Sequence, residues 1–253
     1  KYSRPRLKID STFKTPDRDR TKHGQNLLNQ IDSLSADIES NNVIRKRMEI
    51  KGQEGITVTF ESDPEFELKF ESLEFAPSKI ELLSLKQVDK IWMATVFIPE
   101  GKISHFIKRI TKYAEEETKS GKAKNKDLIE SISKIKKATL ESLWTDDDDL
   151  LPEPGEIIWW EIWLRGGKLN ENVFKFFIEN ARTIGLETSP GKIEFLDRDV
   201  LLVKGSIEQI SDSINLLNSI AEIRSTKVTA EFFTRMDKQE QYEWIDDLKN
   251  RII

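Results

Sequence analysis

The chain has 253 residues, of which 34% are charged and 37% are apolar, with a net charge of −5 and no cysteine. That length fits one large or two small domains. The absence of cysteine excludes disulfides, thiolate metal sites and a cysteine nucleophile, and it fits a reducing compartment. Only His23 and His105 are available for zinc binding or base catalysis. No apolar run reaches the ~18 residues that a membrane span needs, so we expect a cytoplasmic protein without a membrane partner.

The chain opens with a basic segment. Residues 1–24 hold eight Lys or Arg against three Asp, and Pro5 and Pro16 oppose a helix. An arm packed on the surface is favoured over a nucleic-acid arm, because aromatic side chains are not interleaved with the cations. A helix is predicted over 22–40, ending at Asn41-Asn42, because apolar residues recur at helical spacing: Leu27, Leu28, Ile31, Leu34 and Ile38.

A first α+β unit follows. Residues 56–62 alternate between apolar and polar, which indicates a half-buried strand. The remaining elements, in order, are a short helix over 64–75, strands over 80–88 and 91–98 joined by Asp89-Lys90, an amphipathic helix over 102–117, a flexible loop over 118–126 and a helix over 125–144.

An acidic stretch then marks a boundary. Asp146 to Asp149 could offer calcium several oxygens, but their spacing does not match an EF-hand loop. Four adjacent side chains also point in different directions. A solvated linker ending at Pro152, Pro154 and Gly155 is favoured, and no metal site is predicted.

The second unit reads β-α-β-β-α-β, which is the ferredoxin-like order. Its elements are a strand over 156–164, a helix over 170–185 ending near Gly185, strands over 192–197 and 199–204, a helix over 206–223 capped by Ser206, and a strand over 226–233. A last amphipathic helix is predicted over 237–252.

The predicted fold is therefore α+β, with two ferredoxin-like units in tandem and additional helices. The predicted division is an arm plus helix over 1–42, a first unit with its following helix over 43–144, and a linker over 145–155. A second ferredoxin-like unit over 156–235 and a C-terminal helix over 236–253 follow.

No catalytic group is predicted. Ser104 and His105 are neighbours on a helix, so their side chains diverge by about 100° and cannot act as a pair. No phosphate loop is present, and the lone Gly166-Gly167 pair is weak support for any site. No cofactor is expected.

The strand over 156–164 carries the clearest functional signal. One face is wholly apolar and should lie under the helices, whereas Trp159, Glu161 and Trp163 should lie on the open face. Tryptophans on an open face are typical of interface anchors. Coverage by the N-terminal segment or the last helix is the alternative. RNA binding is not favoured, because residues 199–205 lack an aromatic side chain and the chain is acidic.

Three stretches carry a family resemblance. They are residues 18–24 (RDRTKHG), residues 94–102 (ATVFIPEGK) with 140–147 (LESLWTDD), and residues 159–165 (WWEIWLR) with 230–233 (AEFF). Together they resemble the N-terminal, non-catalytic region of large bacterial subtilisin-family serine peptidases. Those peptidases are often encoded beside an AAA-type ATPase, and the pair is associated with defence against phage.

The resemblance implies that a subtilase catalytic domain follows in the same chain, although none of its Asp-Thr-Gly, His-Gly-Thr or Gly-Thr-Ser signatures occurs here. It implies two partners, that catalytic domain and the ATPase. Subtilase propeptides share the ferredoxin-like order and dock their open sheet face on the protease, so the resemblance implies that residues 156–235 are a propeptide-like unit. The whole region is larger than a usual propeptide. The alternatives are a sensor that binds a small molecule between its two units, or an interaction domain unrelated to proteolysis.

Overall fold

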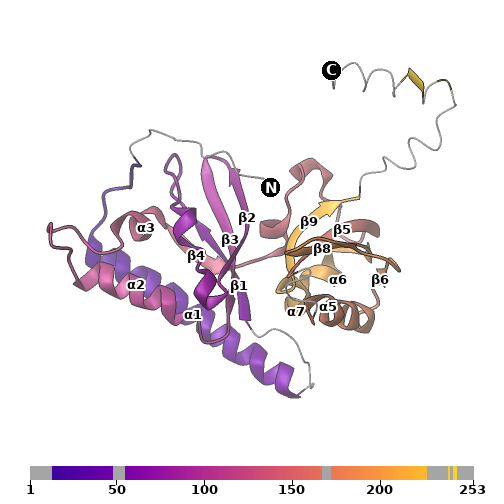
Figure 1. Cartoon of the computed structure of the whole chain (residues 1–253), viewed down its shortest axis with the longest axis horizontal. Coiled ribbons are helices and arrows are strands. Elements are labelled where there is room, and N and C mark those ends of the chain that lie inside the picture. The colour runs from indigo at the N-terminus through magenta and orange to yellow at the C-terminus, as the bar shows by residue number, and fades with distance from the viewer. Residues whose placement is uncertain (1–12, 48–54, 167–171, 227–238, 240–241, 244–253) are drawn as a thin grey trace.

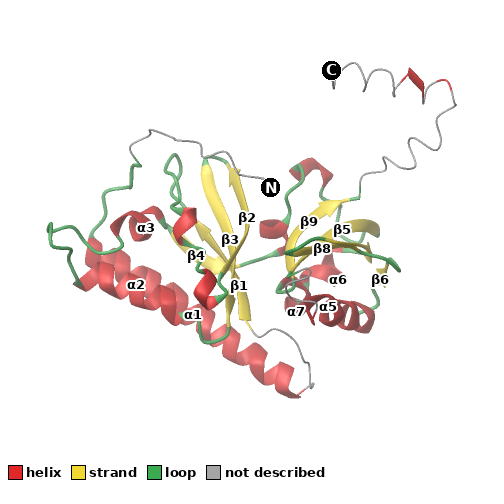
Figure 2. Cartoon of the chain, viewed as in Figure 1, coloured by secondary structure: helices red, strands yellow, loops and turns green. Residues whose placement is uncertain are grey.

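The computed structural model describes residues 13–47, 55–166, 172–226, 239 and 242–243. Within them the chain forms two antiparallel sheets in tandem (Figure 1), each with helices on one face (Figure 2). This confirms the predicted α+β class. No helix in these ranges is long and apolar enough to cross a membrane.

The first sheet has the strand order β2-β3-β1-β4, with every neighbouring pair antiparallel. Asp89 and Lys90 join β2 to β3 with positive φ at both residues, as expected for a tight hairpin turn. The strands are β1 (Gly55–Glu61), β2 (Glu81–Val88), β3 (Ile91–Pro99) and β4 (Lys134–Lys137).

The helix layer of the first unit is assembled from distant parts of the chain. Helix α1 (Arg20–Arg47) precedes the sheet and packs along α2 (Ser104–Glu115). Leu27 of α1 and Ile110 of α2 share one core with the apolar face of β1. The helix predicted over 64–75 is wrong. Glu65 has φ of +70°, outside the helical region, and only the 3₁₀ turns η1 (Phe70–Ser72) and η2 (Ala76–Ser78) form.

The helix predicted over 125–144 is also wrong. The segment forms α3 (Lys126–Ser131), then β4, then α4 (Leu140–Leu143). Ile135 fits helical spacing from Leu128 and also alternates with its lysine neighbours, as in a strand. The pattern alone therefore does not distinguish a helix from a strand. Pairing with β1, where Phe60 lies opposite Ile135, selects the strand.

The second sheet has the order β6-β8-β5-β9, again antiparallel, with the short β7 also paired to β8. This is the ferredoxin-like arrangement. The elements are β5 (Ile158–Arg165), α5 (Asn172–Thr183), β6 (Glu187–Thr188), β7 (Ile193–Glu194), β8 (Arg198–Gly205), α6 (Ile207–Ser211), α7 (Ile214–Leu217) and β9 (Ile220–Ser225); η3 (Asp148–Leu150) lies before β5.

The second half of this unit corrects the helix predicted over 206–223. Ser206 caps α6 as expected, through a bond from the Gln209 amide, but α6 ends at Ser211 and the last strand is β9. Asn218 and Ser219 separate α7 from β9, and the Asn218 side chain is used for hydrogen bonds to the backbone of Gly55 and Thr57. The strand predicted over 226–233 and the helix predicted over 237–252 lie almost wholly outside the described residues.

The two units are in direct contact. Asn218 of the second unit accepts a hydrogen bond from the Thr57 amide at 3.0 Å and donates one to the Gly55 carbonyl at 3.1 Å. The buried Arg165 guanidinium lies 3.4 Å from the centre of the Phe97 ring and 3.6 Å from Glu81. Phe97 and Thr57 lie opposite each other in the first sheet, so the face of that sheet turned away from α1 and α2 is buried at this contact.

The segment before the linker also belongs to this contact. Leu140, Leu143 and Trp144, which the sequence assigned to the first unit, pack in the core of the second. Trp144 forms a bridge to Ile223, and Asp146 accepts bonds from the amide and hydroxyl of Ser225. Part of the outer edge of β9 is therefore covered by this segment, and Asp146 of the acidic stretch has a structural role.

Candidate protein interface

Strand β5 separates its side chains by alternation. Trp160, Ile162 and Leu164 are fully buried against the helices of the second unit. Trp159, Glu161 and Trp163 lie on the other face and are half-buried. The sequence predicts this partition, and it arises because successive side chains in a strand point to opposite faces.

Strand register identifies the neighbours on this open face. Lys204 and Leu202 of β8 lie opposite Trp159 and Glu161. Arg224 of β9 lies opposite Glu161. Directly paired residues share a face. The tryptophan face is defined by Trp159, Glu161, Trp163, Ile193, Phe195, Leu202, Lys204, Glu222 and Arg224.

Cations and an aromatic ring partly cover the two tryptophans. Lys204 Nζ lies 5.8 Å from the Trp159 ring, and the Arg224 guanidinium lies 4.8 Å from the Trp163 ring. Phe195 stacks on Trp163 with ring centres 5.7 Å apart. Cation–π contacts at such half-buried positions contribute only ~0.5–1 kcal/mol each, so Lys204 can move aside at low cost, whereas Arg224 is also held by Glu222.

Glu161 is the polar centre of the face. Its carboxylate accepts a hydrogen bond from the Trp163 indole at 2.7 Å and lies 3.9 Å from Arg224. Arg224 also pairs with Glu222. This network fixes the Trp163 ring on a rigid strand, which suits an interface anchor because little side-chain freedom remains to be lost on binding.

Exposed apolar side chains continue the face beyond Trp163. Ile193 is 63% exposed and Phe195 46% exposed, and Leu196 in the same connection between β7 and β8 is 66% exposed. Sequence reasoning missed these residues, because the short strand β7 places them beside Trp163 only through the register of β8. The sequence does contain one signal for this surface, because three large apolar residues stand close together in one connection: Ile193, Phe195 and Leu196.

The predicted basic arm is bound to the first unit where it is described. Arg18 pairs with Asp63 at 2.6 Å, and Arg20 donates to the Tyr113 and Glu116 carbonyls. Two of the cations considered for nucleic-acid contact are thus used inside the chain. Residues 1–12 lie outside the described part.

The two histidines lie in the first unit. His23 is buried, and its Nε2 lies 3.0 Å from the Ile129 carbonyl oxygen. His105 stacks on Phe75 with ring centres 4.5 Å apart. Burial lowers the pKa of both imidazoles. Across the described ranges, no group of three or more His, Asp or Glu residues could hold a metal ion.

Part of the chain is similar to a known family model. Residues 21–139 match the family model of the Y4kK N-terminal domain, a description that states a position and no activity. The matched part runs from α1 through β4 and excludes the tryptophan face. No curated protein and no solved structure matches the chain.

Proposed function

We propose that this chain is a non-catalytic regulatory module that docks through the tryptophan face on the catalytic domain of a subtilisin-like serine protease. One observation carries the proposal. In the described chain the first sheet buries its open face against the second unit, whereas the second sheet presents half-buried tryptophans and exposed aliphatic side chains. A docked partner would remove this apolar surface from water.

The composition of the face supports a protein partner. Aromatic side chains and arginine are enriched where protein interfaces bind most tightly, and Trp159, Trp163, Phe195 and Arg224 supply both types. Glu161 adds one polar group at the centre, which favours a defined orientation of the partner.

The choice of a subtilase as the partner rests on the sequence resemblance, and the strand order of the second unit supports it. That order is the one found in subtilase propeptides, which dock through the open sheet face. In this proposal the chain acts in the bacterial cytoplasm, and the first unit is the part that would contact an AAA ATPase during defence against phage.

A ligand held between the two units is less well supported. Arg165, Phe97 and Asn218 fill that boundary with direct contacts. An interaction domain unrelated to proteolysis remains the other function that fits the same face, and the experiment below separates the two.

The test uses the catalytic domain that the proposal places downstream in the same reading frame. This chain is titrated into it while peptide hydrolysis and binding are followed. We expect tight binding, and we expect Trp159→Ala with Trp163→Ala to weaken it at least 100-fold, since interface tryptophans typically contribute ~2 kcal/mol or more each. Circular dichroism confirms that the variant is folded.

Leu150→Ala is the matched control, because Leu150 is an exposed apolar residue outside the tryptophan face. It should bind like the parent chain. Loss of hydrolysis on binding would identify a propeptide-like inhibitor, and binding without inhibition would identify a recruiting module. No binding, or no protease domain downstream, removes the subtilase proposal.

A further inference from the structure

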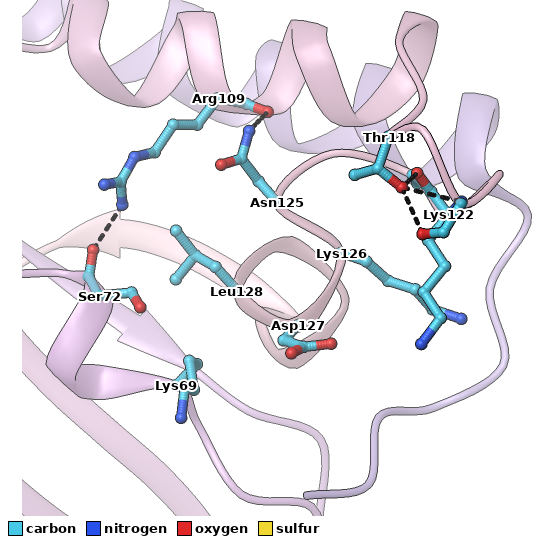
Figure 3. Close-up of a pocket in the computed structure, with 11 residues that line it drawn as sticks. Lys69, Ser72, Arg109, Thr118, Lys122, Asn125, Lys126, Asp127 and Leu128 are labelled. Carbon is cyan, nitrogen blue, oxygen red and sulfur yellow. Dashed lines mark hydrogen bonds between the residues drawn. The ribbon is translucent and has the colours of Figure 1, made fainter.

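The first unit contains a pocket of about 400 Å³ (Figure 3), beside α2 and α3 on the side away from the second unit (Figure 1). Four segments supply its walls: the turn at η1, helix α2, the connection from α2 to α3, and the first turn of α3. Its lining is mostly polar, with Ala123 and Leu128 as the apolar members. The lining residues are Lys69, Ser72, Arg109, Thr118, Ser120, Lys122, Ala123, Asn125, Lys126, Asp127 and Leu128.

Positive charge dominates this pocket. Four cationic side chains line it, and Asp127 is the one carboxylate among the lining residues. Lys69 and Lys126 have acidic neighbours outside the pocket, Glu71 at 3.7 Å and Glu130 at 3.8 Å. Arg109 and Lys122 make no ion pair within the described part of the chain, so their charges remain to be balanced by a ligand or by solvent ions.

Hydrogen bonds hold the walls in place. Arg109 donates to the Ser72 carbonyl at 2.6 Å, and Asn125 donates to the Arg109 carbonyl at 3.2 Å. The hydroxyl of Thr118 bonds to the Lys122 amide and contacts the Ser120 hydroxyl. The connection that the sequence presents as a flexible loop is thus folded into a turn that carries Lys122 to the pocket (Figure 3).

We propose that this pocket binds the phosphate group of a small phosphorylated molecule. Concave surfaces lined by one sign of charge focus the field and attract counter-ions. Lysines, an arginine and hydroxyl donors are the groups that bind phosphate oxygens in proteins. The volume lies within the range of small-molecule sites, and the four cationic side chains in the lining favour an anionic ligand.

Nucleic acid fits this pocket less well. Single-stranded nucleic acid is usually held by aromatic rings along a basic groove, and no aromatic residue lines the pocket. Free phosphate, a nucleotide and a sugar phosphate share the group that the pocket recognises. The proposal does not depend on the tryptophan face, because no residue is common to the two surfaces.

The test is isothermal titration calorimetry of the full chain with inorganic phosphate, pyrophosphate, glucose 6-phosphate and ATP. We expect at least one of these probes to bind with a dissociation constant below 1 mM at physiological ionic strength (~0.15 M). Lys122→Glu should weaken that binding at least tenfold. Lys122 is exposed, so the substitution should leave the fold intact.

Lys119→Glu is the matched control, since Lys119 lies in the same turn, is exposed and does not line the pocket. It should change the affinity less than threefold. Equal weakening by both variants, or no binding of any probe, overturns the proposal. A 12-nucleotide single-stranded RNA that binds more tightly than every small probe, with a steep salt dependence, would also overturn it in favour of nucleic acid.

Discussion

His23 shows how one motif residue fastens the N-terminal helix to the first unit. Its ring is buried beside Tyr113, and Nε2 is within hydrogen-bond distance of the Ile129 carbonyl oxygen. Tyr113 in turn donates to Glu130, and burial beside that carboxylate raises the pKa of Tyr113 to about 12. Contacts within the first unit therefore explain part of the RDRTKHG stretch, residues 18–24.

The buried imidazole predicts a pH-dependent stability. Burial lowers the pKa of His23 below its ordinary value of 6.5, although Asp63 and Glu130 oppose the shift. The unfolded state therefore binds the proton more tightly than the folded state. The free energy of unfolding should be fully retained above pH 6.5 and should decrease as the pH falls below that value. Urea unfolding at a series of pH values between 7.5 and 5 measures this.

His23→Gln isolates the contribution of this side chain, because glutamine keeps a donor near the Nε2 position and does not titrate. The decrease in stability below pH 6.5 should become shallower. His105, whose pKa is lowered in the same direction, should account for part of the decrease that remains. Lys22→Gln, at an exposed neighbour, should leave the slope unchanged. A slope identical in His23→Gln and the parent chain would contradict the assignment.

At the scale of elements, α1 and α2 approach closely at Gly24. A Cβ atom at Gly24 would lie 3.0 Å from the Ala114 Cβ, closer than side chains ordinarily pack. Gly24→Val should therefore destabilise the chain by ~1–3 kcal/mol, the usual cost of overpacking. The midpoint of urea unfolding, followed by circular dichroism, measures the loss.

A second variant tests the cause. Ala114→Gly removes the opposing Cβ, so the double variant should regain part of the stability that Gly24→Val loses, beyond the sum of the single effects. Strict additivity would mean that the valine acts through helix propensity and not through contact with α2.

The elements also show where sequence reasoning succeeds. The hairpin at Asp89-Lys90, the Ser206 cap and the helix end near Gly185 are decided by nearby residues, and all three are correct. The sequence predicts a helix over all of β4 and over residues 220–223 of β9. Their short apolar patterns fit either period, and pairing with β1 and β5, far away in the sequence, decides them.

The same limit applies to the candidate site. Alternation along β5 placed Trp159, Glu161 and Trp163 on one face without any knowledge of their neighbours. Phe195 and Arg224 join them only through strand pairing across the sheet. The proposed phosphate pocket is harder still to predict from the sequence, because Lys69, Arg109 and Lys122 come from three separate segments.

At the scale of the whole molecule, Arg165 couples the two units. Its guanidinium covers the Phe97 ring, its Nε donates to the Asn218 carbonyl at 2.7 Å, and Glu81 is its acidic partner. Burial lowers the pKa of Arg165 to about 10, so the side chain remains charged at neutral pH. We therefore expect the parent chain to unfold in a single transition, with circular dichroism and tryptophan fluorescence coincident.

Arg165→Ala should uncouple the units. It removes the cover from Phe97, leaves Glu81 without this partner and leaves the Asn218 carbonyl without its Arg165 donor. An unsatisfied buried carbonyl alone costs about 1–3 kcal/mol. Because four of the described tryptophans lie in the core and face of the second unit, fluorescence should then report a different midpoint from circular dichroism. Arg165→Met keeps the aliphatic cover and should retain coincident transitions. Coincident, unshifted transitions in Arg165→Ala would mean that Asn218 and the buried segment around Trp144 hold the units together without Arg165.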